Sequence, residues 1–245
     1  MTTLNNLYEY LSYRIPSSLS EEWDNDGIMC MGEDNRVSRV LVTLDITREA
    51  VTYAAANRFG LIVSHHPLIF KPLKSVTDPR LCALMRSGIA AFSFHTRLDA
   101  VDGGVNDTLA SLLGLENVEK MGLGRIGEFK KELTHDEFAE LLKKRLGCEK
   151  LTYVERKPFI RKVALLGGDG KDNYADAAAS GADTYLCGNM SYNTMVDASM
   201  GHINVYEAGH YETEFPVCRT ICDMIKEFDP SITCEIFKAN PIKTV

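Results

Sequence analysis

Four of the six histidines in this chain lie in short motifs that suit metal ions. Two of them, His65 and His66, are adjacent at the end of an apolar run. The other two are each followed, four residues later, by a carboxylate, in the motifs His95-x3-Asp99 and His210-x3-Glu214. Imidazole and carboxylate together are typical ligands of catalytic zinc and of other transition metals. The sequence therefore predicts a metal-dependent protein, with two metal ions.

The adjacent histidines favour two ions rather than one. They follow a strand expected at residues 61–63 and precede Pro67. Because consecutive strand residues point to opposite faces, His65 and His66 can reach one site only where the strand ends. Open α/β sheets bind ligands at the carboxyl ends of their strands. Two ligands that diverge from one point suit two neighbouring ions, and a surface pair of histidines is the simpler alternative.

The His-x3-carboxylate interval places both groups on one face of a helical turn, or together in a tight loop after a strand. His95 follows a strand expected at 89–94, and His210 follows one expected at 203–206. Each carboxylate also has a simpler explanation, which stays open. Asp99 or Asp102 would cap the next helix, and Glu214 would favour the start of the last one.

Strand and helix signals alternate along the chain. Apolar periodicity and capping residues predict helices that start near residues 4, 48, 79, 105, 134, 176 and 217. Further strands are expected at 40–44, 163–166, 184–187 and 234–237, and residues 121–131 read as a Gly- and charge-rich join. This βαβαβ alternation predicts an α/β fold, with a sheet of mostly parallel strands and helices on its faces. The similar order at 40–63 and 163–187 suggests an internal duplication, with chance as the alternative.

Composition sets further bounds. The chain has 245 residues, 25% of them charged, and a net charge of −7, which disfavours broad binding to nucleic acid or to an anionic membrane. We expect no membrane span and no signal peptide. The seven cysteines are odd in number and include no Cys-x2-Cys pair, so reduced thiols and a cytoplasmic protein are expected. Cys218 and Cys222 are expected to be buried apolar residues.

Several motifs together resemble a known family. They are Trp23-Asp24-Asn25-Asp26-Gly27, Val42-Thr43-Leu44-Asp45, Ser64-His65-His66-Pro67-Leu68-Ile69-Phe70-Lys71, His95-Thr96-Arg97-Leu98-Asp99, Gly103-Gly104-Val105-Asn106-Asp107 and Gly209-His210-Tyr211-Glu212-Thr213-Glu214. With them the chain resembles, over essentially its whole length, the NGG-one-interacting-factor-three-like family, the GTP cyclohydrolase I type 2 homologues. Asp26 departs from the family, which commonly has an apolar residue there, and we expect it to touch no ligand.

The resemblance implies two similar α/β domains, a dinuclear metal site in the cleft between them and a ring-shaped homohexamer. We place the first domain at 1–122 plus 208–245 and the second at 123–207. The implied metal ligands are His65, His66, Asp99, His210 and Glu214. Two residues are implied as catalytic: His95, as a further ligand or an acid–base residue, and Glu214, as a carboxylate that bridges the ions.

The function expected from these ligands is metal-dependent hydrolysis. The resemblance implies opening of the guanine imidazole ring of GTP, with zinc, iron, manganese, cobalt or nickel as the two ions. A phosphoester or a cyclic amide would suit the same ligands. Two alternatives remain: a non-catalytic metal-binding adaptor, and a ring associated with nucleic acid.

Three further groups have two interpretations each. Lys71 and Lys74 would hold a substrate phosphate or form a solvated pair. The segment Gly167-Gly168-Asp169-Gly170-Lys171 would form a tight turn in the interdomain cleft or a phosphate-binding turn, and its spacing favours the tight turn. Trp23 is expected to be a core anchor rather than a platform on which a base stacks.

Overall fold

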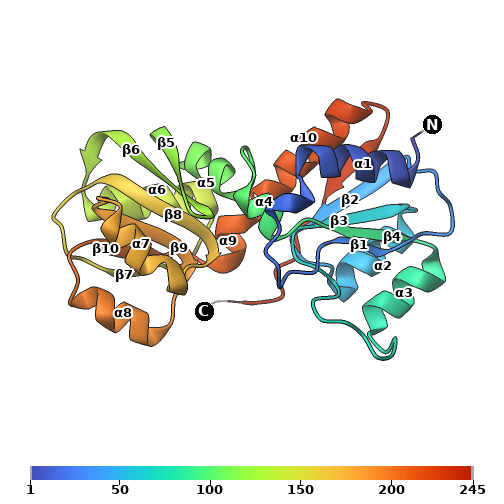
Figure 1. The fold of residues 1–245 in the computed structure, drawn as a ribbon, viewed down its shortest axis with the longest axis horizontal. Helices are drawn as coiled ribbons and strands as arrows, with labels where there is room; N and C mark the ends of the chain where they lie inside the picture. Colours follow the sequence, from blue (N-terminus) through green and yellow to red (C-terminus); the bar gives the residue numbers. More distant parts are fainter. Residues whose placement is uncertain (1, 244–245) are drawn as a thin grey trace. The chain divides into compact units, whose positions relative to one another are not determined.

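The computed structural model describes residues 2–243, which divide into two compact units. The first unit contains the residues up to Val101 together with Cys218–Pro241. The second contains Asp102–Val217 with Ile242 and Lys243. Each unit has its own mixed β-sheet and its own helices (Figure 1). The protein is therefore an α/β protein with two sheets.

The first unit is built around a five-stranded sheet of order β1-β4-β3-β2-β11. Strand β1 is antiparallel to β4, whereas β4, β3, β2 and β11 are parallel. The strands are β1 (Gly27–Cys30), β2 (Arg39–Thr43), β3 (Leu61–Ser64), β4 (Ala90–Ser93) and β11 (Thr233–Ile236). The helices are α1 (Leu4–Arg14), α2 (Arg48–Ala56), α3 (Pro79–Ser87), α4 (Thr96–Ala100) and α10 (Val217–Phe228), with a 3₁₀ turn at Ser17–Leu19.

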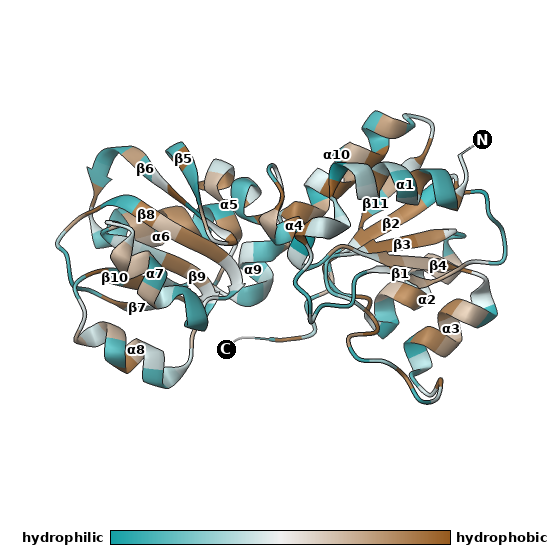
Figure 2. Ribbon diagram, in the orientation of Figure 1, coloured by the Kyte–Doolittle hydropathy of each residue, from teal (hydrophilic) through white to brown (hydrophobic). Residues whose placement is uncertain are grey.

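The central parallel strands of the first unit form its core. Every residue of β3 and β4 is buried, which is typical of parallel strands with helices on both faces. The central strands are accordingly brown in Figure 2. Helix α3 begins as its sequence predicts, since the Asp78 side chain accepts a hydrogen bond from Arg80 N and Pro79 occupies the first turn. Cys218 and Cys222 are buried on α10, as expected.

The second unit is built around a six-stranded sheet of order β5-β6-β8-β9-β10-β7. Strands β8, β9 and β10 are parallel, and the outer pairs are antiparallel. The strands are β5 (Glu116–Met121), β6 (Gly124–Leu133), β7 (Thr152–Val154), β8 (Ile160–Asp169), β9 (Thr184–Asn189) and β10 (Asn204–Glu207). The helices are α5 (Val105–Leu113), α6 (His135–Leu146), α7 (Tyr174–Ala179), α8 (Tyr192–Ser199) and α9 (His210–Glu214), with a 3₁₀ turn at Lys171–Asn173.

The expected domain boundaries differ from these units. Residues 102–122 and 208–217, which the sequence-based division places in the first domain, lie in the second unit. The reason is visible in the packing of α5 and α9 against β8. Leu109 and Leu113 of α5 share one core cluster with Leu165 of β8.

The prediction of a join at 121–131 is wrong. These residues include most of β6, which forms a hairpin with β5. The residues of β5 are exposed or partly exposed, because β5 is an edge strand, and their charges conceal the strand in the sequence. The short strands β1 and β7 also lie at sheet edges, and the sequence analysis predicts neither of them.

The two units repeat one order of elements. In the first unit β2, α2, β3, α3, β4 and α4 follow one another, and in the second β8, α7, β9, α8, β10 and α9 do so. In both, the three strands are adjacent and parallel in that order. Both series end on a short helix that carries a His-x3-carboxylate motif. A duplication in the history of the chain stays a prediction.

Within residues 2–243, no helix has both the length and the apolar character that crossing a bilayer requires.

Candidate metal centre

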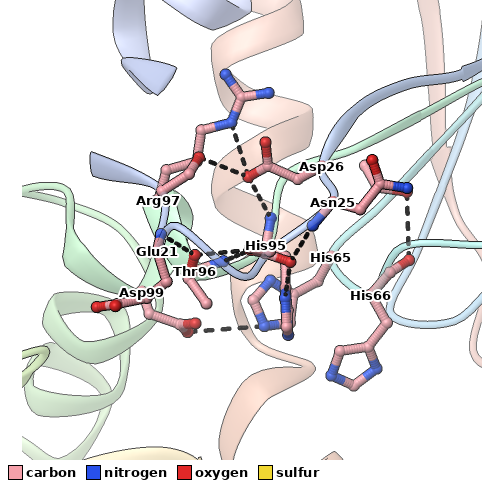
Figure 3. Close-up of polar contacts among 12 residues, drawn as sticks. Glu21, Asn25, Asp26, His65, His66, His95, Thr96, Arg97 and Asp99 are labelled. Carbon is pink, nitrogen blue, oxygen red and sulfur yellow. Dashed lines mark hydrogen bonds and ion pairs between the residues drawn. The ribbon is translucent and has the colours of Figure 1, made fainter. Parts of the chain in front are cut away.

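Three histidines of the first unit gather at the carboxyl ends of β3 and β4. His65 and His66 directly follow β3, and His95 lies just beyond β4, which is the parallel neighbour of β3. One nitrogen from each imidazole can be chosen so that the three atoms lie within 4.8 Å of one another. The ring centroid of His65 is 4.9 Å from that of His66 and 5.3 Å from that of His95. Figure 3 shows the three rings close together.

Hydrogen bonds at the strand ends hold this geometry. Ser64 and Ser93 are fully buried, and their hydroxyl oxygens lie 2.8 Å apart. The Ser64 hydroxyl donates to the carbonyl of His66 at 2.7 Å, and the His66 amide donates to the carbonyl of Leu44 at 3.0 Å. The backbone is therefore fixed where the two adjacent side chains diverge.

The orientation of His65 leaves a lone pair on Nε2. Its side chain is fully buried, and Nδ1 lies 2.9 Å from the carbonyl oxygen of Phe94. A carbonyl only accepts, so Nδ1 carries the proton and Nε2 is the basic nitrogen. A second bond of this kind to the distal nitrogen is typical of histidines that bind metals.

His66 and His95 have the same arrangement with carboxylates. His66 Nδ1 lies 2.8 Å from Asp45 Oδ1, and His95 Nδ1 lies 2.9 Å from Asp24 Oδ1. Each carboxylate accepts the Nδ1 hydrogen bond, orients its ring and fixes the tautomer in which Nε2 can bind an ion. Asp24 and Asp45 lie in two of the motifs that resemble the family, but the sequence alone predicts no role for them.

Asp24 is the most enclosed of these acceptors. Its side chain is fully buried, and it also accepts hydrogen bonds from the amide of Thr96 at 3.0 Å and from the Thr96 hydroxyl at 2.6 Å. Burial alone would raise the pKa of Asp24, but the hydrogen bonds from Thr96 and His95 outweigh it and lower the pKa below its ordinary value. Asp24 is therefore ionised at neutral pH.

Asp99 joins the cluster through His65. Its Oδ1 lies 3.6 Å from His65 Nε2, and a dashed line in Figure 3 marks this contact. The alternative in which Asp99 or Asp102 caps α5 is wrong, because the N-cap of α5 is Gly104 and has no side-chain cap. Asp102 instead pairs with Lys120 at 2.7 Å.

In the second unit, His210 and Glu214 are paired along one turn of α9. His210 Nε2 lies 3.1 Å from Glu214 Oε2, and the Glu214 side chain is only 6% exposed. His210 Nδ1 lies 2.7 Å from Asn189 Oδ1, at the end of β9. Glu214 ends α9 and does not belong to the first turn of α10. The two groups of ligands lie in different units, so a shared site stays a prediction.

The glycine-rich segment at the end of β8 packs against α9. The amide of Gly167 donates to Asn106 Oδ1 at 2.8 Å, and the amide of Gly168 donates to the hydroxyl of Thr213 at 3.1 Å. These amides have partners within the unit, which argues against a phosphate-binding turn. Residues 167–169 are the end of β8, at an irregularity in its pairing with β9, and a 3₁₀ turn follows at Lys171–Asn173. Gly168 has a φ of +74°, and a Cβ there would overlap the carboxylate of Glu214.

The remaining two histidines have other roles. His135 has both ring nitrogens engaged, Nδ1 with the Tyr206 hydroxyl and Nε2 with the carbonyl of Lys157 at 2.8 Å. His202 Nε2 lies 3.2 Å from the carbonyl of Ala178.

One expectation for the tryptophan motif is wrong, because Trp23 is 60% exposed and is no core anchor. Asp26 borders the site through the backbone, since it accepts a hydrogen bond from the amide of His95 at 3.4 Å. Its carboxylate also pairs with Arg97 Nε at 3.0 Å, in a salt bridge whose side chains are nearly buried (Figure 3). Lys71 is exposed, so the structure leaves its two interpretations open.

These side chains fit divalent transition metals. The donors are imidazole nitrogens and carboxylate oxygens, without thiolate, and this mixture suits zinc, iron, manganese, cobalt and nickel. The His65 side chain is also fully buried, and its Nε2 lies 3.6 Å from Asp99 Oδ1 rather than in bulk water. The fold and these clusters define an α/β protein with side chains suited to a metal site.

The chain belongs to the family described as Duf34/NIF3 (NGG1p interacting factor 3), whose model matches residues 2–243. It is 32% identical over 239 residues to a protein of Clostridium perfringens named GTP cyclohydrolase 1 type 2 homolog, with 91% of each chain covered. It is 29% identical to a Helicobacter pylori protein named GTP cyclohydrolase 1 type 2, with 100% of each covered. A Bacillus cereus protein related to NIF3 has the same fold, with a TM-score of 0.92, 23% identity, and 100% and 99% of the two chains covered. The resemblance inferred from the motifs is thus confirmed.

Proposed function

We propose that this protein is a hydrolase that depends on two divalent metal ions. The observation that carries the proposal is the hydrogen bonding of the motif histidines. In His65, His66, His95 and His210, Nδ1 faces an oxygen acceptor, so Nε2 is the nitrogen directed to a ligand. Four histidines whose Nδ1 atoms are hydrogen-bonded in this way lie near carboxylates. This arrangement favours metal binding over a structural role.

The proposed ligands come from both units. The first supplies His65, His66 and Asp99, and the second supplies His210 and Glu214. Glu214 is suited to contact both ions, because it is buried, carries two oxygens and lies 3.1 Å from His210 Nε2. The expected domain arrangement, with the site between the domains, is part of this proposal, as is the ring-shaped hexamer.

The bound ions would polarise the group attacked and make water acidic enough to react at neutral pH. His95 would hold or move a proton at Nε2, because its Nδ1 is committed to Asp24. Asp24 would keep Nδ1 protonated and the ring oriented, so that Nε2 is the nitrogen that accepts or releases the proton. The alternative role of His95, as a further ligand, uses the same nitrogen.

The substrate we propose is a purine nucleotide. In the reaction, one water opens the guanine imidazole ring of GTP to a formamide, and a second water hydrolyses the formamide and releases formate. The names of the relatives from Clostridium perfringens and Helicobacter pylori support this choice. The metal ligands themselves would also serve a phosphoester or a cyclic amide, so the substrate has to be tested separately from the metal.

The test combines metal analysis with turnover on one sample. The full chain is loaded with zinc, iron, manganese, cobalt or nickel in turn, its metal content is measured, and GTP, phosphoesters and cyclic amides are offered. We expect two equivalents of metal and release of formate from GTP. Two equivalents of metal without turnover of any substrate would overturn the hydrolase and favour a metal-binding adaptor.

A further inference from the structure

Two large aromatic side chains are exposed beside the histidine cluster. Trp23 is 60% exposed and Phe70 is 46% exposed, although both residue types are usually well buried. Their ring centroids lie 5.9 Å apart, so they form one apolar surface although they come from distant parts of the chain. We call these two rings the aromatic pair.

The aromatic pair borders His95. The centroid of Trp23 lies 6.2 Å from that of the His95 ring, and the centroid of Phe70 lies 6.3 Å from it. Both contacts are edge-on, at interplanar angles of 78° and 80°. The pair is therefore next to the group proposed to move a proton, and a ligand on it would be within reach of the reacting atoms.

Hydrogen bonds hold the backbone on both sides of the pair. Asp24, which follows Trp23, is buried and bound to Thr96 and His95. The side-chain amide of Asn25 donates to the carbonyl of Ile69, the residue before Phe70. Asn25 thus links the two segments that carry the aromatic rings. Because these hydrogen bonds already order the surface, a ligand that binds it does not have to order it first, and this favours affinity.

We propose that Trp23 and Phe70 form a stacking surface that binds a planar heteroaromatic ring of the substrate beside His95. The inference rests on the proposed function, because it names the class of substrate of that same site. The face of an aromatic ring recognises any flat π-system and is tolerant of its substituents. Recognition by the aromatic pair therefore requires the base of a nucleotide and not its phosphates.

Trp23 is the single tryptophan of the chain, so its fluorescence reports on this surface alone. The metal-loaded full chain is titrated with guanosine, GTP and ribose 5-phosphate, and its emission is followed. We expect saturable quenching by guanosine and GTP and none by ribose 5-phosphate. Equal quenching by ribose 5-phosphate would overturn the inference. So would a ligand-free emission that acrylamide cannot quench, because Trp23 would then already be covered.

Phe70→Ala tests the partner ring while leaving the reporter in place. We expect its dissociation constant for guanosine to rise roughly tenfold, the usual loss when one stacking ring is removed. Phe70→Tyr keeps a ring and should restore wild-type affinity. Tyr13→Ala is the matched control, because Tyr13 is an exposed aromatic residue on α1 of the same unit. Unchanged guanosine affinity in Phe70→Ala would overturn the inference.

Two outcomes separate this inference from the proposed hydrolase. If the wild type hydrolyses GTP and Phe70→Ala leaves its KM unchanged, the stacking surface is wrong and the hydrolase stands. If guanosine quenches Trp23 and Phe70→Ala weakens this binding, while the metal-loaded protein turns over no substrate, the stacking surface stands and the hydrolase is wrong. Metal content is measured in each variant, so that loss of metal is not mistaken for loss of stacking.

Discussion

Gly168 lies directly against the carboxylate of Glu214. A Cβ added to Gly168 would overlap that carboxylate and would lie 3.2 Å from His210 Nε2. The backbone of Gly168 also has a φ of +74°, which favours glycine. The end of β8 thus limits the space around both candidate ligands of the second unit. We therefore expect Gly168, which the sequence presents only as part of a turn, to position them.

Gly168→Ala should therefore weaken metal binding. The added methyl group displaces the Glu214 carboxylate, and we expect metal affinity to fall roughly 10- to 100-fold, as for other changes beside metal ligands. Competition with a chelator of known affinity measures the change. Gly147→Ala is the control, because Gly147 has a φ of +72° but open space around a new Cβ. Both variants should lose about 1–2 kcal/mol of stability from the backbone strain, and only Gly168→Ala should lose metal.

His66→Ala should remove metal with little effect on folding. The His66 and Asp45 side chains are 23% and 39% exposed, so their pairing contributes about 0–1 kcal/mol to stability. His65 is less suitable for this test, because it is fully buried and its removal would also leave a cavity. Elemental analysis should show the loss of at least one metal equivalent. His202→Ala is the control, because His202 is exposed, and it should keep its full metal content. If His66→Ala and His202→Ala contain equal amounts of metal, His66 is not a ligand.

Asp24→Asn should change how stability depends on pH. The folded pKa of Asp24 lies below its ordinary value, because hydrogen bonds from Thr96 and His95 outweigh the effect of burial. Its contribution is therefore fully present above pH about 4, the ordinary pKa of an aspartate, and is lost as the pH falls through the lowered folded pKa. We expect a loss of about 1.5–3 kcal/mol at pH 7, since charge-assisted hydrogen bonds are removed. The difference from wild type should shrink below pH 4.

Urea unfolding of metal-free wild type and Asp24→Asn, at several pH values, measures this difference. Asp34→Asn is the matched control, because Asp34 is an exposed aspartate of the same unit. A stability difference for Asp24→Asn that stays constant from pH 7 to below pH 4 would contradict the assignment of the lowered pKa to Asp24.

The sequence predicts the interior of the fold better than its edges. The buried strands β2, β3, β4, β8, β9 and β10 are visible as apolar runs, because both of their faces are covered. Strand β5 is a charged edge strand, and its hairpin with β6 carries no apolar alternation that a reader could recognise. Strand β5 forms through its pairing with β6, and its own residues do not indicate a strand.

The candidate site is likewise only partly predictable from the sequence. The ligand types and their spacing are local properties, so His65, His66, Asp99, His210 and Glu214 can be proposed from the sequence. The acceptors that orient the histidines are distant in sequence: Asp24 precedes His95 by 71 residues. Asn189 reaches His210 because it ends the strand parallel to β10. Only the strand order reveals such partners, and the sequence does not contain that order explicitly.

The identity of the metal should follow its supply. The candidate ligands are imidazole and carboxylate groups, and such sets bind several first-row metals with affinities that follow the general order for divalent ions. Protein from media enriched in zinc, manganese or iron should therefore carry the enriched metal, as elemental analysis of purified samples would show. One metal at full occupancy in every medium would contradict this expectation and would require a selective feature among the ligands.

Glu214→Gln should affect metal binding and activity more than folding. Glutamine keeps the volume of the buried side chain but removes the negative charge that would offset two dications. We expect one metal to be lost or weakened and hydrolysis to slow by roughly the several kcal/mol that metal ions supply through charge stabilisation. Metal content by mass spectrometry and turnover of GTP measure the two effects. Thermal unfolding of the metal-free protein should change little, since the amide nitrogen of glutamine can donate a hydrogen bond to His210 Nε2.

Glu212→Gln is the control for this last change, because Glu212 is a carboxylate on the same short helix and is not among the proposed ligands. It removes an equal charge from α9, so a general effect of charge would appear in both variants. If Glu214→Gln keeps both metals and full turnover, Glu214 does not bridge the ions. The bridging role would then pass to Asp99, whose Oδ1 lies 3.6 Å from His65 Nε2, and Asp99→Asn should show the losses predicted for Glu214→Gln.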